Sequence, residues 1–219
     1  VDRRPVAITH VDRRPVTDPD LTNRYRLNAR GTIEENGEAD EIHRNLGGGR
    51  FAPVPFTGGN FQDEDGRPLP APPFDWGLSV MVRDVNQDGR PDIYVCNDFD
   101  SPDRLWLNQG GGRFRAAPRD TFRKGSHFAM GLDVADINRD GHDDLFVVDM
   151  LSRDQVMRMD MTASRSIPNP VTDAQPDYMM NTLFLNRGDG TYAEVGQLAG
   201  VNATEWSWGV AFVDVDLDG

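Results

Sequence analysis

Residues 84–92 read DVNQDGRPD, with oxygen-bearing side chains at positions 1, 3, 5 and 9 and a glycine at position 6. Oxygen donors at this spacing are typical of a calcium-binding loop, in which the glycine lets the chain turn sharply around the ion. The pattern recurs at residues 136–144 (DINRDGHDD) and begins again at residues 214–219 (DVDLDG). We call these stretches loop one, loop two and loop three, and they indicate an internal repeat.

Each loop predicts a set of calcium ligands, with side chains at positions 1, 3, 5 and 9 and a backbone carbonyl at position 7. The predicted ligands are Asp84, Asn86, Asp88, Arg90 (carbonyl) and Asp92 in loop one; Asp136, Asn138, Asp140, His142 (carbonyl) and Asp144 in loop two; and Asp214, Asp216 and Asp218 in loop three. Loops one and two each gather three carboxylates, whose mutual repulsion a bound cation would offset.

Other interpretations of the loops are weaker. An EF-hand is excluded because position 12 is Val95 or Val147 instead of a bidentate glutamate, and no helices are expected beside the loops. Magnesium is disfavoured because it prefers octahedral sites that retain water. Asp, Asn and Gly could also simply mark turns, but two full copies in register argue against that alternative. Loop three lacks its ninth residue, so we expect two tight sites and not three.

The loops are flanked by strand-like segments. Apolar residues that alternate with a period of two precede each loop and are typical of half-buried strands; they are Val80 and Val82, Leu132 and Val134, and Val210 and Phe212. Short apolar runs at 93–96 and 145–148 follow loops one and two. A second signature then appears three times, as NLGGGRF at 45–51, NQGGGRF at 108–114 and NRGDGTY at 186–192. Its glycines suit tight hairpin turns.

Each unit therefore reads as four antiparallel strands in a repeat of roughly 50 residues, which is the plan of a β-propeller blade. The sequence predicts an all-β fold, a propeller fragment with calcium-binding hairpin loops. The expected segments are 1–41, an N-terminal excursion or the end of a preceding blade; 42–75, the end of one blade plus a proline-rich insertion; 76–118, a complete blade with loop one; 128–195, a complete blade with loop two and an insertion at 150–180; and 206–219, the start of a truncated blade. A short helix is expected at Ser152–Asp160.

Bulk composition narrows the function. The formal net charge is -13, which disfavours nucleic acid as a partner because such a surface repels phosphate. No apolar run approaches the roughly 20 residues of a membrane-spanning helix. Cys96 is the single cysteine and lies in an apolar run, so we expect it to be buried. The sequence has no initiator Met and no signal peptide, and we interpret it as an internal fragment of a longer protein.

No catalytic residues and no organic cofactor are predicted. The histidines are His10, His43, His127 and His142, and none has metal-ligand spacing to another histidine or to the cysteine. No order of serine, histidine and aspartate suggests a catalytic triad.

These motifs resemble the FG-GAP and VCBS repeats of integrin-α-like propellers. The resemblance covers about Ile42–Gly219, and residues 76–78, 92–98, 126–136 and 181–190 look most similar to bacterial relatives of cartilage acidic protein, which often carry an ASPIC/UnbV segment. Ser79 departs from the pattern, because glycine stands at the equivalent positions 131 and 209. The resemblance implies a seven- or eight-bladed propeller, calcium in the hairpin loops and an exported protein, but it implies no reaction.

The leading functional hypothesis is a non-catalytic, calcium-stabilised module for recognition or adhesion, located outside the cytoplasm as an extracellular, periplasmic or cell-surface protein. Its partner would be an unknown protein or glycan. One alternative is the body or an accessory domain of a secreted polysaccharide-active enzyme. Another is a purely structural scaffold.

Overall fold

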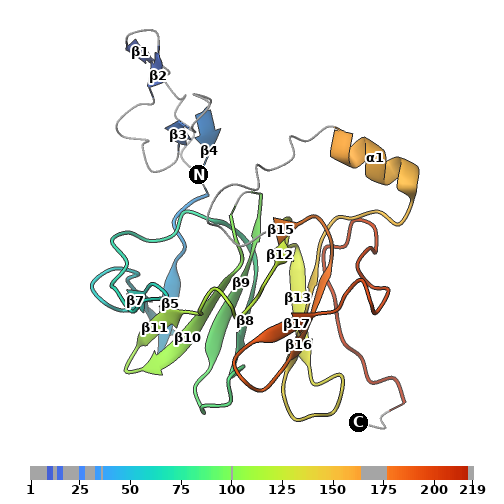
Figure 1. The fold of residues 1–219 in the computed structure, drawn as a ribbon. Coiled ribbons are helices and arrows are strands. Elements are labelled where there is room, and N and C mark those ends of the chain that lie inside the picture. Colours follow the sequence, from blue (N-terminus) through green and yellow to red (C-terminus); the bar gives the residue numbers. More distant parts are fainter. Residues whose placement is uncertain are drawn as a thin grey trace.

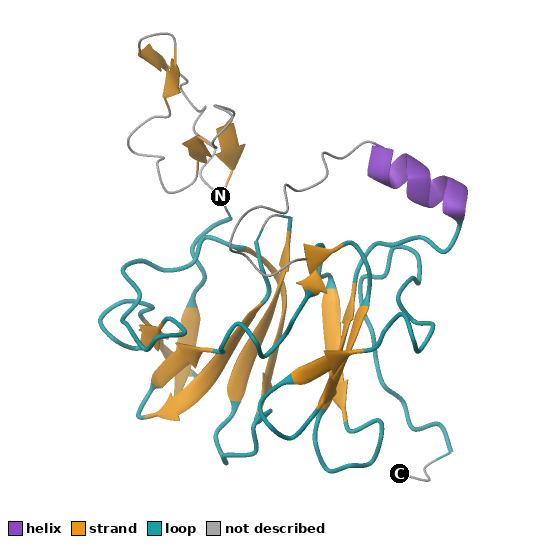
Figure 2. Cartoon of the chain, in the orientation of Figure 1, coloured by secondary structure: helices purple, strands orange, loops and turns teal. Residues whose placement is uncertain are grey.

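The computed structural model describes residues 9–11, 14–16, 25–27, 33–35, 37–99, 101–163 and 177–216. Within this part the fold is built from β-strands with a single helix (Figures 1 and 2). Two main sheets stand side by side, and each carries one of the repeated loops at the lower edge of Figure 1. The all-β class predicted from the sequence is confirmed.

The first main sheet has five strands in the order β7-β11-β10-β9-β8. Its strands are β7 (Phe61–Gln62), β8 (Trp76–Arg83), β9 (Asp92–Asp98), β10 (Arg104–Gly110) and β11 (Arg113–Ala116). Strands β8 to β11 pair antiparallel in chain order, as predicted. Strand β7 was not predicted, and it pairs parallel to β11 through Phe61 opposite Phe114.

The second main sheet has four strands in the order β13-β14-β16-β17, all antiparallel. Its strands are β13 (Gly131–Ala135), β14 (Asp144–Val148), β16 (Thr182–Asn186) and β17 (Tyr192–Glu194). The two sheets therefore repeat the same order of strand, loop, strand, connection, strand, glycine turn and strand. The four antiparallel strands of the two sheets lie within residues 76–116 and 131–194.

The remaining strands form short two-stranded pairs. They are β1 (Thr9–Val11) with β2 (Arg14–Val16), β3 (Tyr25–Leu27) with β4 (Ile33–Glu35), β5 (Ile42–Gly47) with β6 (Arg50–Val54), and β12 (Gly125–Ser126) with β15 (Asp177–Tyr178). The last pair is parallel and the others are antiparallel. The sequence VDRRPV occurs at residues 1–6 and again at residues 11–16. Val11 and Arg14–Val16 of the second copy lie in the β1–β2 pair, and residues 1–6 lie outside the described residues.

Alternation along the strands gives the first main sheet two apolar faces. Tyr94 and Cys96 of β9 face the second main sheet and share a core with Leu145 and Phe184. Ile93, one position earlier, belongs to a second core with residues of the β5–β6 hairpin and the segment that follows it. Cys96 is fully buried, as predicted. Burial of both faces fixes the register of this sheet, because a one-residue slip would exchange the two sets of side chains.

Helix α1 (Gln155–Ala163) lies in the predicted insertion but begins three residues later than expected. The reason is its N-terminal cap. Asp154 Oδ1 accepts the N–H groups of Val156 and Met157, both at 2.9 Å, so the helix begins after this residue and not at Ser152. The helix lies at the opposite edge of the sheets from loops one and two (Figure 1).

The strand predicted before loop three does not form. Residues 206–212 run beside β13 without a regular ladder, and Phe212 N–H donates to Asp133 Oδ2 at 2.6 Å. Gly131 permits this approach, since a side-chain carbon there would lie 3.1 Å from the carbonyl oxygen of Trp208. In the other two units the strand before the loop pairs with the strand after it.

Candidate metal-binding loops

Loop one connects β8 to β9, and loop two connects β13 to β14. Both therefore lie inside hairpins, as the sequence predicted, and at the same edge of the two sheets (Figure 1). The glycine at position 6 has a positive φ in both loops, 83° at Gly89 and 87° at Gly141. Position 4 is also left-handed, with φ of 59° at Gln87 and 61° at Arg139. The two loops thus share a backbone conformation that favours glycine at position 6.

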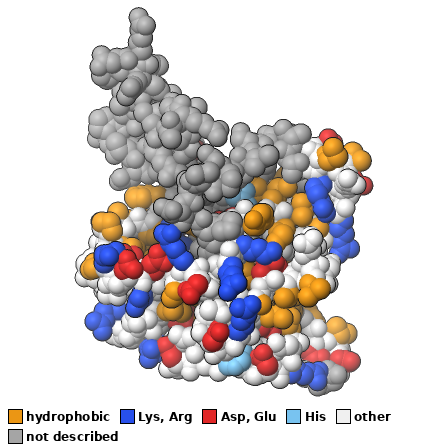
Figure 3. All heavy atoms as spheres, in the orientation of Figure 1, with side chains coloured by type: hydrophobic (Ala, Val, Ile, Leu, Met, Phe, Trp, Pro, Cys, Tyr) orange, Lys and Arg blue, Asp and Glu red, His pale blue; other side chains and the backbone are white. Residues whose placement is uncertain are grey.

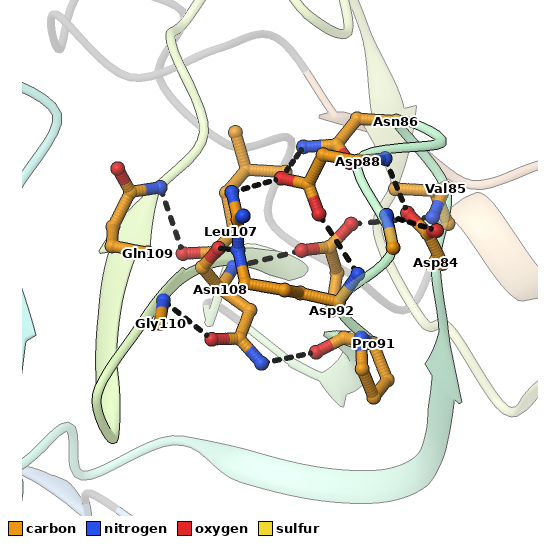
Figure 4. Close-up of polar contacts among 12 residues, drawn as sticks. Asp84, Val85, Asn86, Asp88, Pro91, Asp92, Leu107, Asn108, Gln109 and Gly110 are labelled. Carbon is orange, nitrogen blue, oxygen red and sulfur yellow. Dashed lines mark hydrogen bonds and ion pairs between the residues drawn. The ribbon is translucent and has the colours of Figure 1, made fainter.

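The first three ligand positions of loop one point into the loop (Figure 4). The two carboxylate oxygens of Asp84 accept the N–H groups of Asp88 and Gly89, at 3.1 and 2.8 Å. Asn86 Oδ1 accepts the same Asp88 N–H at 3.1 Å. Asp88 Oδ1 accepts Arg90 N–H at 2.9 Å. Because one N–H is shared by the oxygens of Asp84 and Asn86, those two oxygens converge inside the loop.

Loop two repeats this network. Asp136 accepts the N–H groups of Asp140 and Gly141 at 3.0 and 2.8 Å, and Asn138 Oδ1 accepts the same Asp140 N–H at 3.0 Å. Asp140 Oδ1 accepts His142 N–H at 2.9 Å. The hydrogen bonds that its carboxylate accepts from His142 N–H and from Asn138 Nδ2 hold the pKa of Asp140 below its usual range, which favours the ionised form.

The ninth residues, Asp92 and Asp144, have no exposed surface. Asp92 accepts Val85 N–H at 3.2 Å and Asn108 N–H at 2.7 Å, so it ties the loop to β10. Asp144 accepts the N–H groups of Ile137 and Asn186 in the same way, at 3.1 and 2.8 Å. Burial raises the pKa of both carboxyls, and the charges of the nearby loop carboxylates add to the effect. Each carboxylate oxygen keeps a further lone pair after accepting one N–H.

Two asparagines support the loops from the glycine turns. Asn108 Nδ2 donates to the carbonyl of Pro91 at 2.9 Å, and Asn186 Nδ2 donates to that of Asp143 at 3.2 Å. Their Oδ1 atoms each accept the N–H group two residues later, at Gly110 and Gly188. The sequence contains a signal for this role, the asparagine that opens every glycine turn, but the prediction from the sequence used only the glycines of that signature.

The donor chemistry of the loops fits a calcium ion. Every predicted ligand atom is an oxygen from a carboxylate, an amide or a backbone carbonyl, and calcium prefers such donors. Within the described residues, no three side chains of His, Cys, Asp or Glu gather closely enough to hold a metal by themselves. The asparagine at position 3 and the carbonyl at position 7 would therefore be needed to complete a coordination sphere in either loop.

Loops one and two differ at the side chain of position 7. Arg90 Nη2 forms an ion pair with Asp88 Oδ2 at 2.6 Å, so a guanidinium occupies one oxygen of a predicted ligand. The equivalent residue of loop two is His142, whose backbone N–H alone binds Asp140 in the same manner. The predicted cation site of loop one therefore contains a competing positive charge, the guanidinium of Arg90.

Loop three is described only in part. Asp214 and Asp216 lie on exposed irregular chain, and Asp218 lies outside the described residues.

A second group of acids lies at the opposite edge of the sheets. Asp149 accepts Ser126 Oγ–H at 2.6 Å and the N–H groups of His127 and Phe128. Asp103 accepts Asn97 N–H at 2.8 Å and the Tyr94 hydroxyl at 2.9 Å. Desolvation raises the pKa of Asp103 to about 8, although part of the residue reaches solvent.

The repeat explains Asp103. Its equivalent in the second main sheet is Asn181, whose Oδ1 accepts Asp149 N–H at 2.7 Å, just as Asp103 accepts Asn97 N–H. A protonated aspartic acid has nearly the shape of asparagine and can likewise donate as well as accept. Asp103 therefore acts in the first sheet as asparagine does in the second, in a structural role.

A pocket of about 430 Å³ opens between the two sheets beside the loops. Its wall combines Asn86 and Gln87 of loop one, His142 of loop two and the glycine turn at residues 188–191. Acidic and basic side chains are intermixed on the face shown in Figure 3. Among the described residues, no helix has the length and apolar character needed to cross a membrane.

Comparison with known families supports the repeat. Residues 84–147 match the family model of the FG-GAP-like repeat. The match begins at the first residue of loop one and ends within β14, just after loop two, so it spans the region in which the two hydrogen-bond networks occur. No curated protein matches the chain.

Proposed function

We propose that this chain is part of a calcium-binding β-propeller, in which each main sheet is a blade and loops one and two each hold one calcium ion. The observation that carries the proposal is the shared network of the two loops. Positions 1, 3, 5 and 9 accept equivalent N–H groups in two loops that differ at positions 2, 4, 7 and 8. Turn residues alone would not require four oxygen-bearing side chains in the same orientation twice.

The ligand set would act on stability. In loop one the ion would be held by Asp84, Asn86, Asp88 and Asp92 and by the Arg90 carbonyl, and in loop two by the equivalent residues. The ion supplies positive charge at a place where the chain must bring carboxylates together. Asp92 and Asp144 also accept an N–H group from β10 and β16, respectively. An ion bound to these carboxylates would therefore stabilise the contact between each loop and a strand of its sheet.

The proposed location is outside the cytoplasm. Calcium sites of extracellular modules bind with Kd of roughly 0.1–1 mM, and such sites are filled only where calcium is abundant. Both loops are open at the surface and contain an amide at position 3, which lowers the charge of the site and favours this weaker class.

The proposed role is recognition or adhesion, without catalysis. The loops that brace the sheets and helix α1 lie at opposite edges (Figure 2). Val156, Met157 and Met159 of α1 are exposed by 59–68%. Surface loops and insertions on a rigid scaffold are the usual carriers of specificity, so a protein or glycan partner would meet the edge that carries α1. The acids at that edge, Asp103 and Asp149, accept structural hydrogen bonds and do not favour an enzyme.

The test is a calorimetric titration of the chain with calcium, after removal of bound metal with a chelator. We expect two sites with Kd of roughly 0.1–1 mM. Asp88→Ala should remove the site of loop one, and Asp140→Ala that of loop two. The matched control is Asp189→Ala, which removes an aspartate that accepts Thr191 N–H in a glycine turn outside the loops. Absence of binding, three tight sites, or loss of a site in the control would contradict the proposal.

A further inference from the structure

Loops one and two contact each other directly. Gln87, at the tip of loop one, donates a hydrogen bond from Nε2 to the carbonyl oxygen of Gly141 in loop two. Arg83, just before loop one, donates from Nε and Nη2 to the carboxylate of Asp143 at 2.6 and 3.0 Å. These contacts join residues that are 54 and 60 positions apart in the chain. The side chains of Gln87 and Arg83 therefore each form hydrogen bonds to a residue of loop two.

A third contact passes through Asn186. Its Nδ2 lies 3.3 Å from the carbonyl oxygen of Val85 in loop one and 3.2 Å from that of Asp143 in loop two. Its backbone N–H donates to Asp144 Oδ1 at 2.8 Å. One buried residue thus binds both loops together with the ninth ligand of loop two. None of these contacts is required for either loop to hold an ion by itself.

The contact made by Gln87 reaches a ligand of loop two through a single peptide unit. Gln87 binds the C=O of the peptide that joins Gly141 to His142. The N–H of the same peptide donates to Asp140 Oδ1 at 2.9 Å. Because a peptide unit is planar and rigid, fixing its oxygen also fixes the direction of its N–H. The position of Gln87 therefore influences where the carboxylate of Asp140 lies.

The conformation of loop one determines the position of Gln87. This residue has a left-handed backbone, and it lies between Asn86 and Asp88, whose side chains are both predicted ligands. An ion that orders these two neighbours would also order Gln87. A bound ion in loop one would then reduce the conformational entropy that loop two loses on binding.

We propose that loops one and two bind calcium with positive cooperativity, and that Gln87 carries most of the coupling. The inference rests on the proposed calcium function and adds a property that two independent loops would lack. By linkage the effect is reciprocal, so filling loop two also raises the affinity of loop one. Coupling of this kind typically changes affinity by about 5-fold or more.

Electrostatics opposes this coupling. An ion in one loop reduces the negative potential that attracts the second ion, which lowers its affinity. The loops are exposed, however, and at 0.15 M ionic strength such interactions are screened over about 8 Å. We therefore expect the hydrogen-bonded contact to dominate at that ionic strength, and the coupling to weaken in low salt. This dependence is opposite to that of a coupling caused by charge.

The experiment compares the affinity of loop one for calcium in two states of loop two. Calorimetric titration of Asp140→Ala gives the affinity of loop one alone, and titration of the unmodified chain gives its affinity beside a filled loop two. We expect about 5-fold weaker binding in Asp140→Ala. In the Gln87→Asn background the difference should fall below about 2-fold. Asparagine tolerates the left-handed backbone, so this variant withdraws the amide by one methylene and leaves the loop conformation intact.

The matched control is Gln109→Asn. Gln109 also donates from Nε2 to a backbone carbonyl, that of Leu107 at 3.2 Å, but within its own sheet. It should leave the coupling unchanged. If Asp140→Ala does not fold, judged by circular dichroism, the stepwise binding constants of the unmodified chain and of Gln87→Asn decide. The second ion should bind the unmodified chain more tightly than two independent sites allow, and this excess should disappear in Gln87→Asn.

The outcomes separate the two proposals. Two independent sites in the unmodified chain would overturn the cooperativity and leave the calcium function standing. Coupling that survives in Gln87→Asn would overturn the assignment to Gln87. Absence of calcium binding would overturn both.

Discussion

Loops one and two have the same backbone conformation and the same predicted ligand positions, but the side chain at position 7 differs. Arg90 lies over Gly110 and His142 lies over Gly188, which are equivalent glycines of the two turns. The guanidinium of Arg90 then binds the carbonyl oxygen of Asn108 and the carboxylate of Asp88. The comparison teaches that the loop conformation depends on the acceptors at positions 1, 3, 5 and 9. The side chain at position 7 can differ without changing that conformation, and it alters the net charge beside the predicted ligands.

The largest effect should come from the ninth position. Asp92→Ala or Asp144→Ala leaves two backbone N–H groups without an acceptor, and each unpaired buried donor costs about 1–3 kcal/mol. In chelator we expect the free energy of unfolding to fall by about 2–6 kcal/mol in either variant. In calcium the loss should be larger by about 1.4 kcal/mol, because the stabilisation by the ion in that loop is lost as well. Urea denaturation measures it, with the exposed Asp120→Ala as control. A large effect in one sheet and none in the other would break the equivalence of the two networks.

The second prediction concerns the acid at the opposite edge, where Asp103 replaces the asparagine of the second sheet. The pKa of Asp103 is raised to about 8 in the folded protein, against about 3.9 in the unfolded chain. Between these values the folded state binds a proton that the unfolded state lacks, so stability falls as pH rises. The slope contributed by one such group is at most about 1.4 kcal/mol per pH unit.

Asp103→Asn should remove that contribution, so the variant gains stability relative to the unmodified chain as pH rises from about 5 to 8. Asn181→Asp should add a contribution of the same sign to the second sheet. Urea denaturation across this range measures both. An unchanged pH dependence in Asp103→Asn would show that Asp103 is ionised in the folded protein.

The smallest effect is the exchange of position 7. An exposed ion pair such as Arg90–Asp88 is worth about 0.2–1 kcal/mol, and the ion must displace it. Arg90→His should therefore raise the calcium affinity of loop one by about 1.4- to 5-fold, and His142→Arg should lower that of loop two by a similar factor. Calorimetric titration of each variant, with the other loop emptied, measures the change. A lower calcium affinity in Arg90→His, or a higher one in His142→Arg, would show that the arginine strengthens calcium binding.

The parts of the fold that the sequence predicted are those with short-range causes. Alternating apolar residues and Asp/Asn/Gly turns fix the hairpins around loops one and two, and these signals lie within a few residues of the structure they determine. Strand β7 was missed because its pairing with β11 depends on a parallel contact across about 50 residues. Residues 206–212 carry a strand pattern but form no ladder with any other described residue. Pattern alone therefore overestimated this strand.

Only the local part of the candidate site could likewise be predicted from the sequence. The predicted ligands follow from spacing within nine residues, and in loops one and two their side chains accept equivalent N–H groups. The contacts of Gln87 and Asn186 between the loops require the packing of two sheets, which no local pattern encodes. The role of Asp103 became evident only when strand register placed it opposite Asn97 as Asn181 stands opposite Asp149. Calcium itself stays a prediction until binding is measured.

The central claim is that the loops bind calcium and that the ion stabilises the fold. The most direct test is thermal unfolding of the unmodified chain, Asp88→Ala and Asp140→Ala, each in chelator and in calcium at about ten times its Kd. A filled site then adds about 1.4 kcal/mol, or roughly 3–6 °C in melting temperature for a chain of this size. We predict a rise from two sites in the unmodified chain and from one in each variant, with little difference among the three in chelator. Equal melting temperatures of the unmodified chain in calcium and in chelator would contradict the account.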